Sequence, residues 1–289
     1  MPADLSYDGI ELGKQYGPYY YPLRDRIARV LEATENQHAW HRARSPWGPP
    51  VAPPSVLGNV CMRFIDWVAP VPPGTLHARQ DVETLAALRL DRQLIGYGKF
   101  VEKYERRGRR WAVFEARYRD ETGLLIGHGR TTIAFPERIE TKDDPVAVKQ
   151  RAARTGELTP VTRTLTQEKM TAFSEDSYNA RNDRSIHVHP VIAKELGFEK
   201  TVAQAMMAAD YISEMMTGVF EKAWFENAKL SLVFLAPIMR DDTLTVNGRL
   251  KEAPQEGAVV RKVYDVWAEN QNGEAVAVGT ASSLVMPEG

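Results

Sequence analysis

The sequence predicts an α+β protein made of two copies of one unit, in which an antiparallel sheet wraps around a long buried helix. Three observations support this prediction. Residues of the first half recur in the second half at a nearly constant spacing. Segments rich in β-branched and aromatic residues lie on both sides of a short glycine turn. A segment before them is apolar on two helical faces, which is typical of a helix surrounded by other elements.

The repeat has an offset of 150 residues. Segment 91–98, Asp-Arg-Gln-Leu-Ile-Gly-Tyr-Gly, aligns with 241–248, Asp-Asp-Thr-Leu-Thr-Val-Asn-Gly, and keeps the first Asp, the Leu and the last Gly in place. The same offset aligns further residues: Glu102 with Glu252, Val113 with Val263, Gly123 with Gly273 and Gly129 with Gly279. A single match of glycine or leucine has little weight. Their order and spacing over a long stretch predict a duplication.

The second half shows the elements of this unit most clearly. Segments 243–251, 258–268 and 274–286 are rich in Val, Leu, Thr and aromatic residues with partial alternation, a pattern typical of strands. Asn272-Gly273 lies between the last two segments. This pair predicts a tight hairpin, because a type I′ turn needs positive φ at both central residues. Thr122-Gly123 occupies the equivalent place in the first half.

A buried helix is predicted at 203–217, before these strands, with Gly218 as its stop. Two of its faces are apolar: Met207, Tyr211 and Met215 lie on one, and Ala208, Ile212 and Met216 lie on the other. We therefore expect a helix enclosed by the sheet rather than one with a solvated face.

The chain is expected to divide into an N-terminal unit, 1–136, a linker, 137–160, and a C-terminal unit, 161–289. Segment 137–154 is dense in charge and poor in large apolar residues. Such a composition is typical of a solvated linker or a surface helix.

Composition excludes several classes of protein. The 37 basic and 38 acidic residues leave a formal net charge of −1, which argues against nucleic-acid binding as the main function. The longest nearly apolar run, 230–239, is far shorter than the ~18–20 residues that span a bilayer, and the N-terminus has no secretory pattern. The one cysteine, Cys61, can form neither an internal disulfide nor a multi-cysteine metal site. We expect a cytoplasmic protein with no metal site and no membrane partner.

Ordered motifs in the second half carry a resemblance to a known family. They are Phe173-Ser-Glu-Asp176, Ile186-His-Val-His-Pro190, Gly197-Phe198, Val202-Ala-Gln-Ala-Met-Met207 and Lys229-Leu-Ser-Leu-Val-Phe-Leu-Ala-Pro237 followed by Asp241 or Asp242. Over about residues 165–285 the sequence resembles the MaoC-like dehydratases, a hotdog-fold group that includes the (R)-specific enoyl-CoA hydratases. With the duplication, this resemblance implies a double hotdog.

The resemblance also implies an activity. It implies an enzyme, a lyase of fatty acid metabolism, that adds or removes water at the α,β double bond of an acyl-CoA or acyl-carrier-protein thioester. No cofactor is expected. Relatives of this kind pair their sheets, so a homodimer is a further expectation from the resemblance.

His187 matches the histidine of the family's hydratase segment, but the position of its acidic partner is open. In the family an Asp precedes the His by five residues, and here Asp176 precedes His187 by eleven. Either Asp176 keeps the role and 177–183 is an insertion, or Asn182 occupies the Asp position. An Asp beside His187 could help take a proton from water, whereas Asn182 could only orient the water. His187 would then be the only base.

The start of the 203–217 helix matches the family's backbone donor. The family has His-Gly where this sequence has Gln204-Ala205. The resemblance assigns the Ala205 N–H to the thioester oxygen, because unsatisfied N–H groups and the helix dipole favour negative charge at a helix N-terminus. Ser213 matches a helix serine that shapes the pocket.

Arg181 and Arg184 are either solvated, or they bind a phosphate or carboxylate of the substrate.

The first half has the pattern of a degenerate site. Glu35-Asn-Gln-His38 loosely repeats an acid-to-His spacing, and Val51-Ala52 aligns with Val202-Ala203 with one residue of slippage. Pro53 and Pro54 then lack the N–H donors that a carbonyl needs. We expect this half to bind the acyl tail. Four aromatic residues suit either such a tunnel or a plain core: Trp40, Trp47, Phe64 and Trp67.

Two other functions stay open. One is a hotdog thioesterase, in which Gln204 would help to position water. The other is a catalytically degenerate partner that binds acyl chains or supports a second subunit. Both are motivated by the eleven-residue spacing from Asp176 to His187 and by Gln204-Ala205.

Overall fold

The computed structural model describes residues 2–140 and 155–286. The first half contains, in order, β1 (Tyr16–Tyr21), α1 (Leu23–Ala33), α2 (Ala39–Arg42), α3 (Val56–Val68), β2 (Leu76–Thr84), β3 (Leu94–Arg106), β4 (Arg109–Asp120) and β5 (Leu125–Arg138). The second half contains β6 (Val161–Thr164), α4 (Gln167–Ser174), α5 (Tyr178–Arg181), α6 (Pro190–Glu195), α7 (Met206–Phe220), α8 (Lys222–Asn227), β7 (Lys229–Phe234), β8 (Thr243–Glu252), β9 (Gln255–Glu256), β10 (Val259–Glu269) and β11 (Ala275–Val285).

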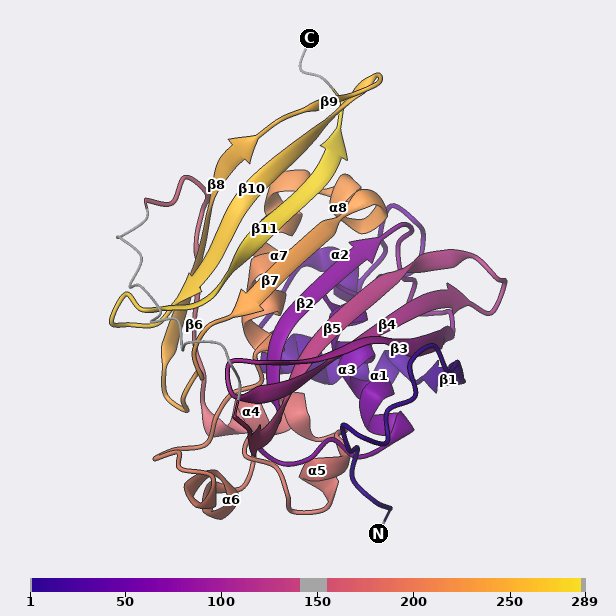
Figure 1. Ribbon diagram of the computed structural model, residues 1–289. Coiled ribbons are helices and arrows are strands. Elements are labelled where there is room, and N and C mark those ends of the chain that lie inside the picture. Colours follow the sequence, from indigo (N-terminus) through magenta and orange to yellow (C-terminus); the bar gives the residue numbers. More distant parts are fainter. Residues whose placement is uncertain (1, 141–154, 287–289) are drawn as a thin grey trace.

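One antiparallel sheet runs through both halves. Within the described residues its strand order is β1-β3-β4-β5-β2-β7-β11-β10-β8-β6, with β9 on β10. The halves join where β2 pairs with β7, centred on Asp81 opposite Ser231. Figure 1 shows the sheet curving around the two long helices, α3 under the first half and α7 under the second. Both helices are rich in fully buried residues, as a helix enclosed by a sheet must be.

The two halves repeat the same strand register at the offset of 150 residues. Gly98 pairs with Ala116 on β3–β4, and Gly248 pairs with Val266 on β8–β10. The β-bulge also recurs, since one unpaired residue precedes both Glu102 and Glu252. A bulge is a specific local feature, so its recurrence is strong support for the duplication.

The long helix of the second half differs from its predicted bounds. It begins at Met206 and continues through Gly218 to Phe220, so Gly218 as a stop was wrong. The helix ends where Glu221 takes a φ of 47°. Phe220 is buried and stacks on Trp224, and this packing favours a helix that continues past the glycine. Of the predicted linker 137–160, residues 141–154 lie outside the described residues.

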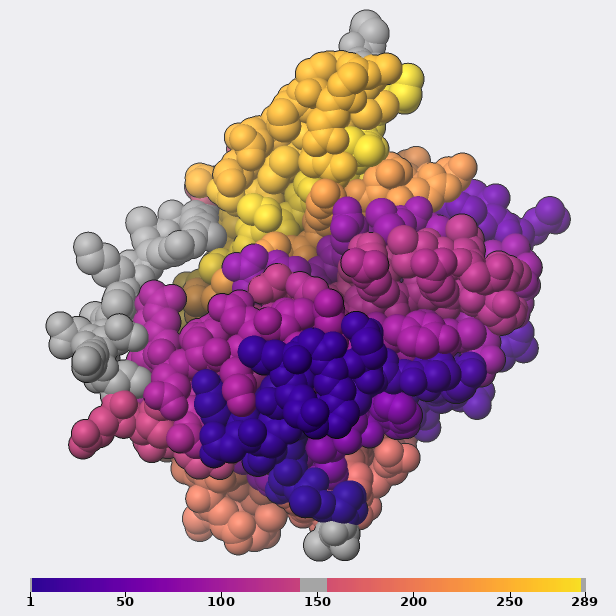
Figure 2. Space-filling model, turned by 45° about the vertical axis from the view of Figure 1, so that its right-hand side comes forward, coloured from indigo at the N-terminus to yellow at the C-terminus, as the bar shows by residue number. Residues whose placement is uncertain are grey.

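The N-terminal segment lies across the first half, as Figure 2 shows. Its backbone is fixed by hydrogen bonds from Leu5 N to Pro70 O and from Gly13 N to Phe100 O. Lys103 Nζ donates to two carbonyl oxygens of the same segment, those of Tyr7 and Ile10. In the described part of the chain, no helix is long and apolar enough to cross a membrane.

Candidate active site

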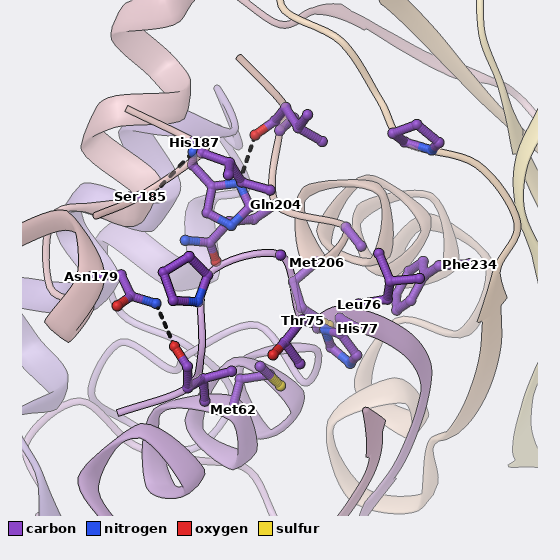
Figure 3. Close-up of a pocket in the computed structure, with 18 of the residues that line it drawn as sticks. Met62, Thr75, Leu76, His77, Asn179, Ser185, His187, Gln204, Met206 and Phe234 are labelled. Atoms are coloured by element: carbon purple, nitrogen blue, oxygen red, sulfur yellow. Dashed lines mark hydrogen bonds between the residues drawn. The ribbon is translucent and has the colours of Figure 1, made fainter. Parts of the chain in front are cut away.

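A cavity of about 460 Å³ lies between the two halves. Its walls come from the C-terminal part of α3, the loop 71–75 with the start of β2 that follows it, the segment 177–187, the start of α7 and the end of β7. Figure 3 shows residues of both halves pointing into this space. The second half supplies the polar groups His187, Gln204 and Asn179. Apolar residues of both halves form much of the remaining wall: Met62, Leu76, Trp111, Met206, Phe234, Pro237 and Ile238.

His187 lies on the cavity with a defined tautomer. Its backbone N–H donates to Ser185 Oγ at 3.1 Å, which holds the loop before α6. Its ring Nδ1 lies 2.6 Å from the carbonyl oxygen of Val202. A carbonyl only accepts hydrogen bonds, so Nδ1 carries the proton and Nε2 keeps a lone pair. Burial lowers the pKa of His187 to about 4, with the positive charge of Arg63 as a smaller cause. The imidazole is therefore neutral near pH 7.

The start of α7 presents a free backbone donor to the same cavity. Ala205 precedes the first helical residue and lines the cavity. Its N–H has no acceptor among the described residues, although the next turn is closed by the bond from Ala208 N to Ala205 O. An unsatisfied N–H at the positive end of a helix favours a developing negative charge.

Gln204 also lines the cavity, and both ends of its amide are in use. Its Nε2 donates to Ser174 Oγ at 2.9 Å, and its Oε1 accepts from Arg63 Nη2 at 3.4 Å. These contacts fix the side chain next to His187, as Figure 3 shows. Gln204 therefore has little freedom to bind a water molecule of its own.

Neither candidate for the acidic partner is among the residues that line the cavity. The Asp176 carboxylate forms ion pairs with Arg26 and with Arg63, whose Nε is 3.0 Å from Asp176 Oδ1. Asn182 is exposed, and its Nδ2 donates to the Tyr178 carbonyl at 2.8 Å. The ion pairs direct Asp176 toward the first half, and the turn of α5 directs Asn182 into solvent.

Of the remaining candidate residues, one lines the cavity and two do not. Arg184 lines the cavity but is paired with Asp4 of the N-terminal segment. Arg181 is exposed and lies outside the cavity. Ser213 is buried away from the cavity, where its Oγ accepts from Trp224 Nε1 at 2.9 Å. Ser213 therefore orders α8 rather than shaping this cavity.

Asn179 and Asp66 are among the polar residues of the cavity that the sequence analysis did not single out. Asn179 donates from Nδ2 to the Val71 carbonyl at 2.8 Å, while its Oδ1 is buried without a partner in the part of the chain described. Asp66, on α3, accepts the backbone N–H of Tyr178 at 2.7 Å. Asn179 could have been found from its place in the loop after Asp176. Asp66 belongs to the other half, and no sequence spacing connects it with His187.

The first half contains a counterpart of His187, and it is His41 rather than His38. His41 Nδ1 lies 2.8 Å from the Val51 carbonyl, as His187 lies against Val202. Burial lowers the pKa of His41 to about 4, and its Nε2 has no partner among the described residues. Pro53 and Pro54 precede α3 at the place of Gln204 and Ala205.

Aromatic side chains occupy the space next to His41. The Phe225 ring lies 5.8 Å from His41 and within 5.5 Å of the Trp40 and Trp47 rings. Phe64 is fully buried and Trp67 is 53% exposed. None of the four aromatic residues suggested for an acyl tunnel lines the cavity, and three of them pack as ordinary core or against it.

Solved structures of other proteins share this architecture. A protein described as a MaoC-like dehydratase superimposes with a TM-score of 0.74 at 14% identity, over 98% of this chain and 100% of that one. A MaoC-like dehydratase from Phytophthora capsici gives a TM-score of 0.67 at 16% identity, over 98% of both chains. A Mycobacterium tuberculosis protein described as having a double hotdog fold gives 0.64 at 11% identity, over 98% of this chain and 99% of that one.

The chain has the double-hotdog fold.

This fold confirms the architecture predicted from the repeat. Each hotdog unit supplies one central helix, α3 or α7, and β2 and β7 join the units into one sheet. A scan against protein-family models gives no match for the sequence, and a search of curated proteins gives no significant match. Among residues 2–140 and 155–286 no group of three or more His, Cys, Asp or Glu side chains is arranged to hold a metal ion.

Proposed function

We propose that this double-hotdog protein is a hydratase or dehydratase that acts on the α,β double bond of an acyl thioester. One observation carries the proposal: the unprotonated Nε2 of His187 and the free N–H of Ala205 belong to the same cavity. The first is a base for water and the second is a donor for the thioester oxygen. The dehydratase descriptions of the structurally similar proteins agree with this chemistry.

The reaction follows from these two groups. His187 Nε2 takes a proton from water while the water oxygen bonds to the β-carbon. The π electrons of the double bond move toward the thioester carbonyl, whose oxygen becomes an enolate held by the Ala205 N–H. The imidazolium then returns its proton to the α-carbon, and the carbonyl re-forms. Dehydration is the reverse. General acid–base catalysis of this kind contributes about 10²- to 10⁴-fold.

Asn179 would orient the water. Its Nδ2 is fixed by the Val71 carbonyl, so Oδ1 is the acceptor that is left for one hydrogen of the water. His187 Nε2 would accept the other hydrogen. With Asp176 bound by two arginines, His187 is the single base in this scheme.

The substrate would lie between the units, with its acyl group against the apolar wall formed by β7, the start of β2 and the loop 71–75. The first unit would therefore bind substrate through this loop and not through its own His41 site. The thioester is expected to be carried by coenzyme A or by an acyl carrier protein. A homodimer and a cytoplasmic location stay predictions.

A catalytically degenerate acyl-binding partner is the second candidate. It is favoured by the Asp176 carboxylate, which is engaged by Arg26 and Arg63 and does not line the cavity. A thioesterase has less support, because Gln204 already uses both ends of its amide.

One assay separates these functions. Purified protein is incubated with a panel of enoyl-CoA thioesters, and the conjugated absorbance, the released thiol and the binding heat are followed. Loss of absorbance without thiol supports the hydratase, and release of thiol supports the thioesterase. Binding without either change supports the partner. If the protein neither reacts with nor binds any member of the panel, the proposal is contradicted.

A further inference from the structure

A buried arginine of the first unit faces the catalytic end of the cavity. Arg63 lies on α3, its side chain is 13% exposed, and it lines the cavity with His187, Gln204 and Ala205. Its Nε forms the ion pair with Asp176 at 3.0 Å, and its Nη2 donates to Gln204 Oε1 at 3.4 Å. These two contacts, one at Nε and one at Nη2, fix the plane of the guanidinium.

Arg63 has donors to spare. A guanidinium has five N–H groups, and within the described residues Asp176 contacts Nε and Gln204 contacts Nη2. At least three N–H donors are left without a protein acceptor. A ligand that fills the cavity displaces the water around these donors. Unpaired donors of a buried charge are costly, so a productive ligand has to supply an acceptor.

The position of Arg63 indicates which atom of the ligand supplies this acceptor. Its partner Gln204 directly precedes Ala205, and its charge is close enough to lower the pKa of His187. Asp66 lines the same cavity, and its negative charge raises the pKa of Arg63 against the lowering effect of burial. The free N–H of Ala205, the guanidinium of Arg63 and the base of His187 therefore all border one end of the cavity.

We propose that Arg63 is a catalytic residue that donates to the thioester oxygen of the substrate together with the Ala205 N–H. This inference rests on the proposed function and deepens it. Addition of water at the β-carbon places negative charge on that oxygen. A charge-assisted hydrogen bond is roughly twice as strong as a neutral one, and preorganised donors at a developing oxyanion stabilise the transition state most. Asp176 is then a positioning residue that holds Arg63.

Substitutions at Arg63 and Arg26 test the proposal. Both arginines pair with Asp176, but only Arg63 lines the cavity, so Arg26→Gln is a matched control. We expect Arg63→Gln to lower kcat about 10²- to 10³-fold, the range for losing one oxyanion donor. Arg26→Gln should stay within a few-fold of the wild type. Arg63→Lys keeps the charge and covers the case in which Arg63→Gln does not fold.

A binding measurement separates this inference from the proposed function. The probe is an arylacryloyl-CoA, whose absorbance moves to longer wavelength when its thioester carbonyl is polarised. We expect the shift in the wild type and in Arg26→Gln, and a much smaller shift in Arg63→Gln. An Arg63-dependent shift without turnover supports the role of Arg63 and contradicts the hydratase. Turnover with the same shift and kcat in Arg63→Gln and Arg26→Gln overturns the role of Arg63 alone. No shift in the wild type also overturns it.

Discussion

His41 and His187 make the same backbone contact in the two hotdog units. The Nδ1 of His41 lies 2.8 Å from the Val51 carbonyl, and the Nδ1 of His187 lies 2.6 Å from the Val202 carbonyl. His187 lines the cavity between the units, and His41 does not. The loop 71–75 and the start of β2 follow α3 and leave space beside His187. In the second unit α8 follows α7 and places Phe225 beside His41. Both units thus contain the imidazole, but of these two histidines it is His187 that is placed to reach a ligand in the cavity.

Removal of the His187 imidazole should abolish turnover and leave the fold intact. His187→Ala deletes the proposed base, for which about 10²- to 10⁴-fold in kcat is expected, and one hydrogen bond worth about 1 kcal/mol. His189→Ala is the control, because His189 does not line the cavity. Steady-state rates with an enoyl-CoA and melting temperatures check both. Full activity in a folded His187→Ala variant would refute the assignment.

The activity should persist well below the usual titration range of histidine. The pKa of His187 is lowered to about 4 by burial, so Nε2 keeps its lone pair until the pH approaches that value. We expect kcat/KM to be flat from pH 8 to about pH 5 and to fall tenfold per pH unit below about 4. A profile measured over the range in which the protein stays folded checks this. An acid limb near 6.5 would show that the imidazole is solvated.

Ala205→Pro should remove the oxyanion donor without disrupting α7. The φ of Ala205 is −56°, which proline adopts, and α3 begins after Pro53-Pro54 in the other unit. We expect kcat to fall about 10²- to 10³-fold with little change in melting temperature. Ala205→Gly, which keeps the N–H, is the control. Equal rates in the two variants would mean that this N–H does not bind the substrate.

Asp176→Asn should lower the free energy of unfolding, because the Asp176 carboxylate holds two arginines. Removing one partner of a buried ion pair costs about 3 kcal/mol or more, and here two arginines lose their counter-ion. Asn182→Ala should be neutral in stability and activity because Asn182 is exposed. Urea unfolding and enoyl-CoA kinetics of both variants decide between the two positions left open by the sequence. Normal stability of Asp176→Asn would contradict the role of its carboxylate in holding Arg26 and Arg63.

Asp210 should destabilise the protein at high pH. This α7 carboxyl is buried, accepts from Asn59 Nδ2 at 3.3 Å, and has its pKa raised to about 7, chiefly by burial. Between pH 4 and 7 the unfolded chain releases this proton and the folded protein keeps it, so stability falls as the pH rises. The free energy of unfolding of Asp210→Asn should therefore rise by about 2–4 kcal/mol relative to that of the wild type between pH 5 and pH 8. Chemical unfolding at both pH values measures this, and a constant difference would contradict it.

The sequence by itself determined the double-hotdog architecture. The repeat at 150 residues predicted two equivalent units, and strand pairing keeps that offset through the bulge before Glu102 and Glu252. These features are local, because alternation, turn residues and helical periodicity depend on neighbouring positions. The end of α7 escaped prediction, since Phe220 packs against Trp224 and the helix passes through Gly218.

Tertiary structure alone decided which side chains share the cavity. Arg63 and Asp66 come from the first unit and line the cavity with His187 and Asn179 of the second. These residues are far apart along the chain, and no sequence motif connects positions so distant. The same packing directs Asp176 away from His187, because the charges of Arg26 and Arg63 attract its carboxylate. The pairing of β2 with β7 brings the units together, and the contacts made there depend on three-dimensional geometry rather than on neighbouring residues.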